Sequence, residues 1–280
     1  MKRRHFLGTT AAGLALSSCR KNSTAKQWKG IAMGIEVTVS YHGDPDFEFA
    51  LQTVAAAESA LTLWSSDSAL SRLNREGSLA NPPQPLLDCL QKSRELFEAT
   101  QGLFDPTIHS FLRWAKSEYE AGRTPPQSGI TERLKLVDFS RVEISPTQVS
   151  LPPGMSLSLN AIAQGYLTDL FAKNFPATSA LINFGEYRVI GDQPWPVEVK
   201  GERHQLTRAL AVSSGSGQRL SATSAANHLI DPKTGKSPPP KIVVAVEADE
   251  AWLADGLSTV VAIGGGIPAK YQNAKILIAE

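Results

Sequence analysis

Two side chains near the end of the chain have the types and the spacing to bind a metal ion. Asp255 and Thr259 are four residues apart in "WLADGLSTVV", a segment predicted to be helical, so both lie on one face of it. A carboxylate and a hydroxyl one turn apart offer two hard oxygen ligands to Mg²⁺, which keeps its other positions for water and phosphate. Leu253, Leu257 and Val260 mark a separate apolar face, which would leave the polar pair free to line a cleft. The alternative is a solvated aspartate beside a threonine that bonds back to its own helix.

A histidine precedes a tight turn in "NHLIDPKTGKSP", which runs from Asn227 to Pro238. Pro232 fixes its own φ and Gly235 can take a positive φ without steric cost, so "DPKTG" is typical of a turn. Such a turn does not require a histidine. His228 is therefore either a bystander at the end of a strand or a group that the turn holds against a ligand.

Three further segments carry short polar residues where a site could form. In "TQGLFDPTI", Asp105 precedes a proline just after a predicted helix, a position that suits a turn as well as a ligand contact. "LNAIAQGY" joins a predicted strand to a helix, so its backbone could face a phosphate or expose a carbonyl. "AVSSGSGQRL" ends a strand in serine and glycine. Each segment alone is typical of a loop.

The helices and strands expected around these residues indicate an α+β fold, a single compact domain with a mainly antiparallel sheet and packed helices. The first helix should begin with Asp44 as N-cap and Pro45 at its first position, with a buried face of Ala50, Val54, Ala57 and Leu61. A second helix is expected over 85–99, and a hairpin in "RVEISPTQVSLP". Further strands are expected in "SLSLN", "SALINF", "PVEVKG", "ALAVSS", "IVVAVEA" and "KILIA", and further helices in "AIAQGYLTDLFAKNF" and "DEAWLADGLSTVVAIG". "GRTPPQSG" and "TGKSPPPK" are expected to be loops.

The N-terminus has the features of an export signal. "MKRRHFLGTTAAGLALSSC" has a charged start and then an apolar stretch too short to span a bilayer. The paired arginines resemble a twin-arginine signal, and "LSSC" resembles a bacterial lipobox that would make Cys19 the lipid-modified first residue. The alternative is an ordinary secretory signal with a chance cysteine. We expect a signal peptide over 1–18, a tether over 19–28 and one domain over 29–280, in a lipoprotein on the periplasmic side of a membrane.

Charge and cysteine content narrow the class of protein. The net charge of the chain is +1, and removal of residues 1–18 leaves 25 basic against 27 acidic residues, a net charge of −2. This balance argues against nucleic-acid binding. The chain has 2 cysteines. If Cys19 carries lipid, Cys89 has no partner for a disulfide, and we expect it to be a small buried hydrophobe.

Eight segments in order resemble one family, the FAD:protein FMN transferases (ApbE family). The resemblance covers nearly all of the chain after the signal, from about 33 to 264. It rests on "AMGIEV", "LTLWSSDSALSRLN", "GLFDPTI", "LNAIAQGY", "INFGEYRVIG", "VSSG", "NHLIDPKTGKSP" and "LADGLSTVVAIGG". The domain over 29–280 is thereby identified as a flavin transferase domain with the ApbE-like fold.

The resemblance implies a reaction and a set of residues. Such enzymes split FAD at its pyrophosphate, attach FMN to a threonine or serine of a target protein and release AMP, a reaction that depends on Mg²⁺. Export implies a redox protein outside the cytoplasmic membrane as acceptor. The implied metal ligands are Asp255, Thr259 and the backbone carbonyl of Ala161, and His228 would be a base or a charge stabiliser. The implied FAD contacts are Met33, Trp64, Leu103, Phe104, Asp105, Ser158, Gln164 and Ile230.

Departures from the family pattern touch FAD recognition. The acidic residue of the family before Leu-Gly-Gly is Ser158 here, the two glycines are Asn160 and Ala161, and the usual lysine is Gln164. The second glycine of its Gly-Gly turn is Glu186, where the backbone would otherwise approach closely. Two alternatives to transfer follow: a non-catalytic FAD-binding lipoprotein, or hydrolysis of FAD to FMN and AMP with water in place of the acceptor.

Overall fold

The chain folds around a seven-stranded antiparallel sheet, as the sequence predicts. The structure is a computed structural model that describes residues 25–32, 34–222 and 224–280. The strand order is β1-β2-β6-β7-β10-β11-β12, and all neighbouring pairs are antiparallel. The strands are β1 (Lys26–Ala32), β2 (Ile35–Tyr41), β6 (Ala180–Asn183), β7 (Tyr187–Ile190), β10 (Ala209–Ser214), β11 (Val243–Ala248) and β12 (Lys275–Ala279). Because β1 begins at Lys26, the domain starts inside the segment expected to be a tether.

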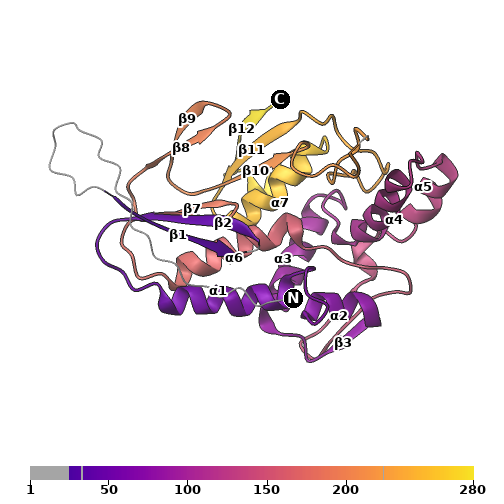
Figure 1. The fold of residues 1–280 in the computed structure, drawn as a ribbon, viewed down its shortest axis with the longest axis horizontal. Helices are drawn as coiled ribbons and strands as arrows, with labels where there is room; N and C mark the ends of the chain where they lie inside the picture. The colour runs from indigo at the N-terminus through magenta and orange to yellow at the C-terminus, as the bar shows by residue number, and fades with distance from the viewer. Residues whose placement is uncertain (1–24, 33, 223) are drawn as a thin grey trace.

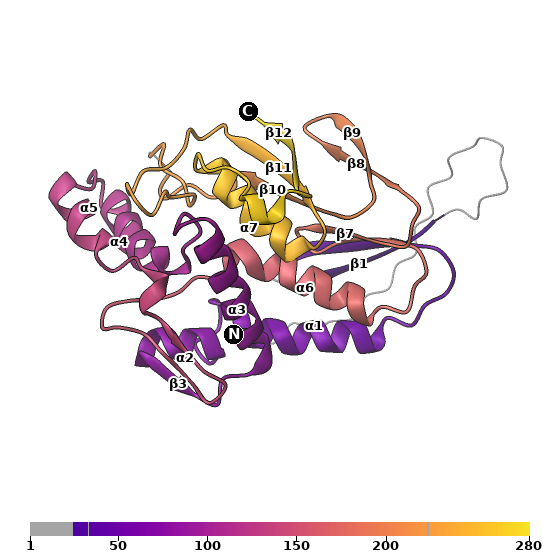
Figure 2. The same ribbon diagram turned by 180° about the vertical axis from the view of Figure 1, so that it is seen from behind.

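The described chain has seven α-helices. They are α1 (Glu48–Leu61), α2 (Ala69–Glu76), α3 (Gln84–Ala99), α4 (His109–Glu120), α5 (Gln127–Leu134), α6 (Asn160–Asn174) and α7 (Ala251–Ala262). The short 3₁₀ turns are η1 (Pro106–Ile108), η2 (Phe139–Arg141) and η3 (Ala269–Tyr271). α6 and α7 cover one face of the sheet, and α1 and α3 pack on the far side of α6 (Figure 1). α4 and α5 pair at the end of the molecule distant from β1 (Figure 2).

Two small sheets complete the fold. β3 (Ser78–Ala80), β5 (Gln148–Ser150) and β4 (Glu143–Ile144) form one, in the order β3-β5-β4. Its β4–β5 pair is the hairpin that the sequence predicts. β8 (Trp195–Val199) and β9 (Glu202–Leu206) form the other, and its apolar side chains pack on the face of the main sheet opposite α6 and α7. Alternation along β11 explains this, since Ala245 faces the hairpin while Val244 and Val246 face the helices.

The buried stripe of α1 is confirmed, but its predicted start is wrong. The exposed fraction is no more than 2% at each stripe residue, Ala50, Val54, Ala57 and Leu61. The helix begins at Glu48 rather than at Pro45, because the Asp46 carboxylate accepts a hydrogen bond from the backbone N–H of Glu48 at 2.9 Å. Asp44, the predicted cap, instead forms an exposed ion pair with Lys26 at 3.2 Å.

The predicted strand "SLSLN" is wrong: residues 156–159 lie outside any sheet, and Asn160 is the first residue of α6. Side chains bind the backbone of this segment and thereby replace a neighbouring strand. Leu157 donates its N–H to the Asn74 Oδ1 at 2.7 Å, and its carbonyl accepts from the Asn74 Nδ2 at 2.8 Å. Ser156 donates to the Ser110 Oγ at 2.8 Å. Alternating apolar residues here reflect burial on one side and not pairing with another strand.

The remaining expectations for helices and loops are largely confirmed. α3 begins one residue before the predicted 85, with Pro83 as N-cap, and ends at 99 as expected. The segment "GRTPPQSG" is a loop only up to Pro126, because α5 begins at Gln127 directly after this proline. Cys89 is fully buried inside α3, as expected. No helix within the described part of the chain is long and apolar enough to cross a membrane.

Candidate active site

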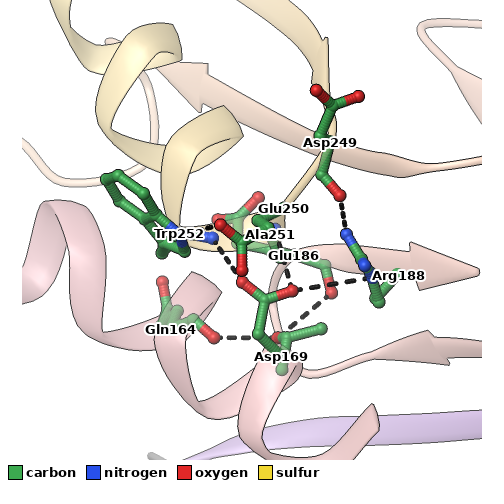
Figure 3. Close-up of polar contacts among 9 residues, drawn as sticks. Gln164, Asp169, Glu186, Arg188, Asp249, Glu250, Ala251 and Trp252 are labelled. Carbon is green, nitrogen blue, oxygen red and sulfur yellow. Dashed lines mark hydrogen bonds and ion pairs between the residues drawn. The ribbon is translucent and has the colours of Figure 1, made fainter. Parts of the chain in front are cut away.

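The start of α7 is fixed by a side chain from α6. Asp169 accepts hydrogen bonds from the backbone N–H groups of Ala251 (3.0 Å) and Trp252 (2.9 Å), which have no partner within their own helix. Arg188 of β7 lies 3.7 Å from the Asp169 carboxylate and also donates to the carbonyl of Asp249 (Figure 3). Contacts with both α6 and the sheet thereby hold the start of α7 in place.

One glycine lets α6 and α7 approach closely. A Cβ at Gly165 would lie 2.4 Å from the carbonyl oxygen of Ala251 and 2.5 Å from the Cα of Trp252, so only glycine fits at this crossing. At this contact the Gly165 N–H donates to the Asp255 Oδ2 at 3.2 Å. The close approach therefore brings the candidate metal ligand of α7 against the first turns of α6.

Asp255 is buried, whereas the sequence predicted that it would line an open cleft. Its exposed fraction is 5%, because α7 lies between the sheet and α6 and all its residues except Thr259 and Val261 are buried. The apolar residues of α7 are therefore not confined to one face. Burial raises the pKa of Asp255 to about 7, against the opposing effect of the hydrogen bond from Gly165.

Thr259 lies one turn further along α7 and is half-buried. Its Oγ1 lies 3.4 Å from the Oγ of Ser213 on β10, which in turn lies 2.7 Å from the Oγ of Ser258. The hydroxyl of Thr259 is directed toward a neighbouring strand, and it is not engaged in the bond back to its own helix that was the alternative interpretation. Ser213 adds a third hydroxyl that the sequence did not single out.

The first turn of α6 carries the third predicted metal ligand. Ala161 departs from helical geometry, with φ −87° and ψ 15°, so the helix is kinked there. Gly165, four residues further along α6, donates its N–H to the Asp255 carboxylate. Asp255 therefore lies against the turn of α6 that follows this kink.

The donor set suits a hard cation. It consists of a carboxylate, a backbone carbonyl and hydroxyls, which are the oxygen ligands that Mg²⁺ prefers. Within the described ranges, no group of three or more His, Cys, Asp and Glu side chains is arranged to hold a metal ion. A cation at Asp255 would therefore need hydroxyl, carbonyl and water oxygens, or oxygens from a phosphate ligand.

His228 is held against the segment that follows β10. Its backbone N–H donates to the carbonyl of Gln218 at 3.0 Å, and its Nδ1 lies 3.2 Å from the same oxygen. A carbonyl only accepts, so Nδ1 carries the proton and Nε2 is left as an acceptor. Burial lowers the pKa of His228, which keeps the imidazole neutral. This segment follows the end of β10 at Ser214, and Ser213, the residue before that end, lies 3.4 Å from the Thr259 hydroxyl.

The predicted turn after His228 is confirmed. Asp231 accepts from the Lys233 N–H (2.8 Å), the Thr234 hydroxyl (2.7 Å) and the Gly235 N–H (2.8 Å), and Gly235 has φ +69°. Ile230, a predicted FAD contact, packs instead into an apolar cluster with α4 and has an exposed fraction of 7%. Ile230 and the turn at Gly235 thus pack the segment that follows His228 against α4.

The "LFD" segment lies beside the first turn of α6. Phe104 is buried and packs against α7, where a Cβ on Gly256 would lie 3.4 Å from its ring. Both Asp105 oxygens are engaged: Oδ1 accepts from the N–H (2.8 Å) and hydroxyl (2.5 Å) of Thr107, and Oδ2 from the N–H of Phe139 (3.1 Å). Burial raises the pKa of Asp105. Its carboxylate stabilises the turn, which leaves backbone rather than side chain for a ligand.

Several other predicted FAD contacts border the same region. Ser158 donates its N–H to the carbonyl of Pro106 at 3.0 Å, which joins the start of α6 to the "LFD" turn, and Leu103 is half-buried. Gln164 lies against the turn between β6 and β7, where a Cβ on Gly185 would be 2.9 Å from its Nε2 (Figure 3). Trp64 has an exposed fraction of 91%. Met33 and Cys19 lie outside the described residues.

Glu186, regarded from sequence only as a departure in a glycine turn, is a buried carboxylate in this region. Its exposed fraction is 6%, and its Oε2 accepts from the backbone N–H of Val212 at 3.3 Å. Burial, and then the neighbouring Asp255 carboxylate, hold the pKa of Glu186 well above its usual range. The only sequence signal for this buried carboxylate was an acidic residue between two apolar strand segments.

A cleft of about 780 Å³ lies elsewhere in the described chain. It is bounded by α3, α6 and β7, and none of the predicted site residues lines it. Its lining includes acidic side chains such as Asp88 and Asp169 and basic ones such as Lys92, Lys173 and Arg188, so it favours neither charge of ligand. The convergence of oxygen donors at Asp255 marks the candidate active site better than the volume of this cleft does.

Comparison with known proteins gives one consistent family. The ApbE family pattern matches residues 33–273. An FAD:protein FMN transferase of Rhodobacter capsulatus is 27% identical over 209 residues, which covers 64% of this chain and only 38% of that protein. An FAD:protein FMN transferase of Treponema pallidum (strain Nichols) is 25% identical over 252 residues, which covers 76% of this chain and 68% of that protein.

The fold agrees with this match. The crystal structure of the flavinyl transferase ApbE of Pseudomonas stutzeri, in its apo form, superposes with a TM-score of 0.73 at 22% identity and covers 88% of each chain. This likeness confirms the predicted ApbE-like fold. Since the family pattern extends over most of the chain and the fold agrees with it, this chain belongs to the ApbE family.

Proposed function

We propose that this protein is an FAD:protein FMN transferase, which moves FMN from FAD to a threonine or serine hydroxyl of an exported redox protein with Mg²⁺ and releases AMP. Membership of the ApbE family and the names of the two relatives support the reaction class. The observation that carries the proposal is the contact of Asp255 with the Gly165 N–H at 3.2 Å, which holds the carboxylate against α6 four residues after its kink at Ala161.

The reaction exchanges one phosphoester partner for another. The acceptor hydroxyl oxygen attacks the phosphorus of the FMN half, and the bond from this phosphorus to the bridging oxygen breaks. AMP leaves with that oxygen and its electron pair, and the hydroxyl proton passes to a base. Bound Mg²⁺ supplies charge neutralisation for the pyrophosphate. Asp255, Thr259 and the Ala161 carbonyl would hold it.

His228 is suited to be the base. Its Nδ1–H donates to the Gln218 carbonyl at 3.2 Å, so Nε2 has a free electron pair, and burial keeps the ring neutral by lowering its pKa. A charge stabiliser would need the protonated ring, which burial disfavours. The geometry therefore favours the base among the two roles that the sequence left open.

The flavin would meet an exposed aromatic surface and a polar backbone. The indole of Trp64 is almost fully exposed and is large enough to stack on an isoalloxazine ring. Leu103, Ser158 and Gln164 border the start of α6, where backbone groups could bind phosphate oxygens. The side chains of Phe104, Asp105 and Ile230 are buried. They would stabilise the segments that contact FAD rather than contact it themselves.

We also propose that the protein is anchored by lipid at Cys19 and acts on the periplasmic side of a membrane. The arginine pair and the "LSSC" segment support this. Mass spectrometry of the protein extracted from membranes with detergent should find a diacylglycerol-modified cysteine as first residue. A soluble form cleaved elsewhere would favour an ordinary secretory signal.

A direct assay tests the proposed reaction. Purified protein is incubated with FAD and Mg²⁺, with and without an acceptor domain that carries a threonine site, and AMP release and acceptor-bound flavin fluorescence on a denaturing gel are measured. We expect fluorescent acceptor from the wild type and none from Asp255→Ala. AMP without labelled acceptor would indicate hydrolysis of FAD. Bound FAD with neither product would indicate a flavin-binding lipoprotein.

A further inference from the structure

The start of α7 depends on a side chain of another helix. The N-cap residue of α7, Glu250, forms no capping hydrogen bond, and its carboxylate instead accepts from the indole N–H of Trp252 at 2.8 Å. The backbone N–H groups of Ala251 and Trp252 are bound by the Asp169 carboxylate of α6. A cap from the same segment would hold a helix start relative to its own chain only, whereas this cap ties the start of α7 to α6.

The same two helices are joined again one turn away. On α6, Gly165 precedes Asp169 by four residues, and on α7, Asp255 follows Ala251 by four. Asp169 binds the Ala251 N–H at 3.0 Å, and the Gly165 N–H donates to the Asp255 Oδ2 at 3.2 Å. The helices therefore run antiparallel along this contact, and the two hydrogen-bonded points are one helical turn apart on each of them. A shift of α7 along α6 would break both contacts together.

Arg188 holds the Asp169 carboxylate in place from the sheet. Its guanidinium lies 3.7 Å from Asp169 and also donates to the carbonyl of Asp249, two residues before α7 (Figure 3). The side chain of Asp169 has an exposed fraction of 16%. Its carboxylate is thus fixed between β7, α6 and the start of α7, and none of these contacts involves a proposed ligand of the cation.

We infer that Asp169 is a positioning residue for the cation site: it holds α7 at the place along α6 where Asp255 and Thr259 can bind the cation. The inference rests on the proposed function, which supplies the cation. The hydrogen bond from Gly165 to Asp255, at 3.2 Å, is already at the long end of the usual range, so a small shift of α7 would break it. Mg²⁺ demands near-ideal geometry from its oxygen ligands. Loss of the Asp169 carboxylate should therefore weaken cation binding although no ligand is removed.

Calorimetric titration of the full protein with Mg²⁺, without FAD, tests the inference. We expect a dissociation constant roughly tenfold or more higher in Asp169→Ala than in the wild type. Asp169→Asn should lie between the two, because the amide has the same shape but only one acceptor oxygen for two N–H groups. Ser68→Ala is the matched control. It also removes a helix cap, since Ser68 accepts from the Ser71 N–H at 3.0 Å, but α2 carries no residue of the candidate site, so its Mg²⁺ affinity should equal that of the wild type.

Hydrogen exchange of the Gly165 amide gives a second readout that needs no metal. In EDTA, this amide should exchange roughly tenfold or more faster in Asp169→Ala than in the wild type, when its rate is taken relative to the amides of β6 in the same protein. A general loss of stability would instead speed the exchange of both groups of amides together. The relative rate in Ser68→Ala should therefore equal that of the wild type.

The outcomes separate this inference from the proposed function. Wild-type Mg²⁺ affinity in Asp169→Ala, with binding lost in Asp255→Asn, would refute the inference and leave the proposed function intact. An unchanged relative exchange rate at Gly165 would refute it as well, even if Mg²⁺ binding were weaker. Wild-type protein that binds no Mg²⁺ without FAD would also refute it, and the flavin transfer assay would then decide the proposed function separately. Unchanged affinity in Asp255→Asn would refute the metal site itself.

Discussion

Replacement of Gly165 by alanine should separate α6 from α7 and destabilise the protein. The added Cβ would lie 2.4 Å from the Ala251 carbonyl oxygen and 2.5 Å from the Cα of Trp252. These are backbone atoms of a helix that is held by Asp169 and the sheet, so they cannot move aside as a side chain could. Overpacking of this kind costs about 3 kcal/mol, and alanine recovers about 1 kcal/mol through its higher helix propensity. The free energy of unfolding should therefore fall by about 2 kcal/mol.

Urea and thermal unfolding of Gly165→Ala measure this effect. A loss of about 2 kcal/mol corresponds to a decrease in Tm of about 4–8 °C for a domain of this size. Gly266→Ala is the control, because a Cβ there meets no atom within 4 Å and its φ is not positive. The variant should also bind Mg²⁺ more weakly, since the Gly165 N–H positions Asp255. A Gly165→Ala protein as stable as Gly266→Ala would refute the close helix contact and the geometry built on it.

Three further substitutions test separate parts of the structure. Asp105→Ala should lower the free energy of unfolding by about 3 kcal/mol in urea denaturation, because three hydrogen bonds to η1 and η2 lose their acceptor; an unchanged midpoint would contradict this role. His109 has its pKa lowered to about 4 by burial and by Arg113, so the wild type should lose stability as pH falls from about 6.5 toward 4. His109→Asn should reduce that loss of stability by about 2 kcal/mol between pH 7.5 and 4.5. Parallel profiles of unfolding free energy against pH for the two proteins would contradict this effect of His109. His228→Gln should slow flavin transfer about 100-fold or more with unchanged Tm and Mg²⁺ affinity. A variant with wild-type activity would show that His228 is not the base.

Local patterns predicted most of the secondary structure. The stripe of α1, the ends of α3 and the turn at Gly235 depend on residues close together in sequence, so they could be predicted without the fold. Predictions failed where a distant group decided the outcome. The Asn74 side chain binds the N–H and the carbonyl of Leu157 and takes the place of a neighbouring strand there, although the two residues are 83 apart in sequence.

The sequence by itself determined the fold class, the family and the helix face that Asp255 and Thr259 share. A carboxylate and a hydroxyl four residues apart on a helix share a face in any fold, and the ordered motifs identified the family.

Only the tertiary structure decided the environment of those residues. Burial of α7 between the sheet and α6 raises the pKa of Asp255 to about 7, and the absence of a side chain at Gly165 lets the two helices meet. The same packing buries Glu186, a residue of the turn between β6 and β7, and leaves Asp105 as a turn-stabilising carboxylate. Desolvation and the proximity of charges depend on all elements that surround a group, so no local pattern could encode them.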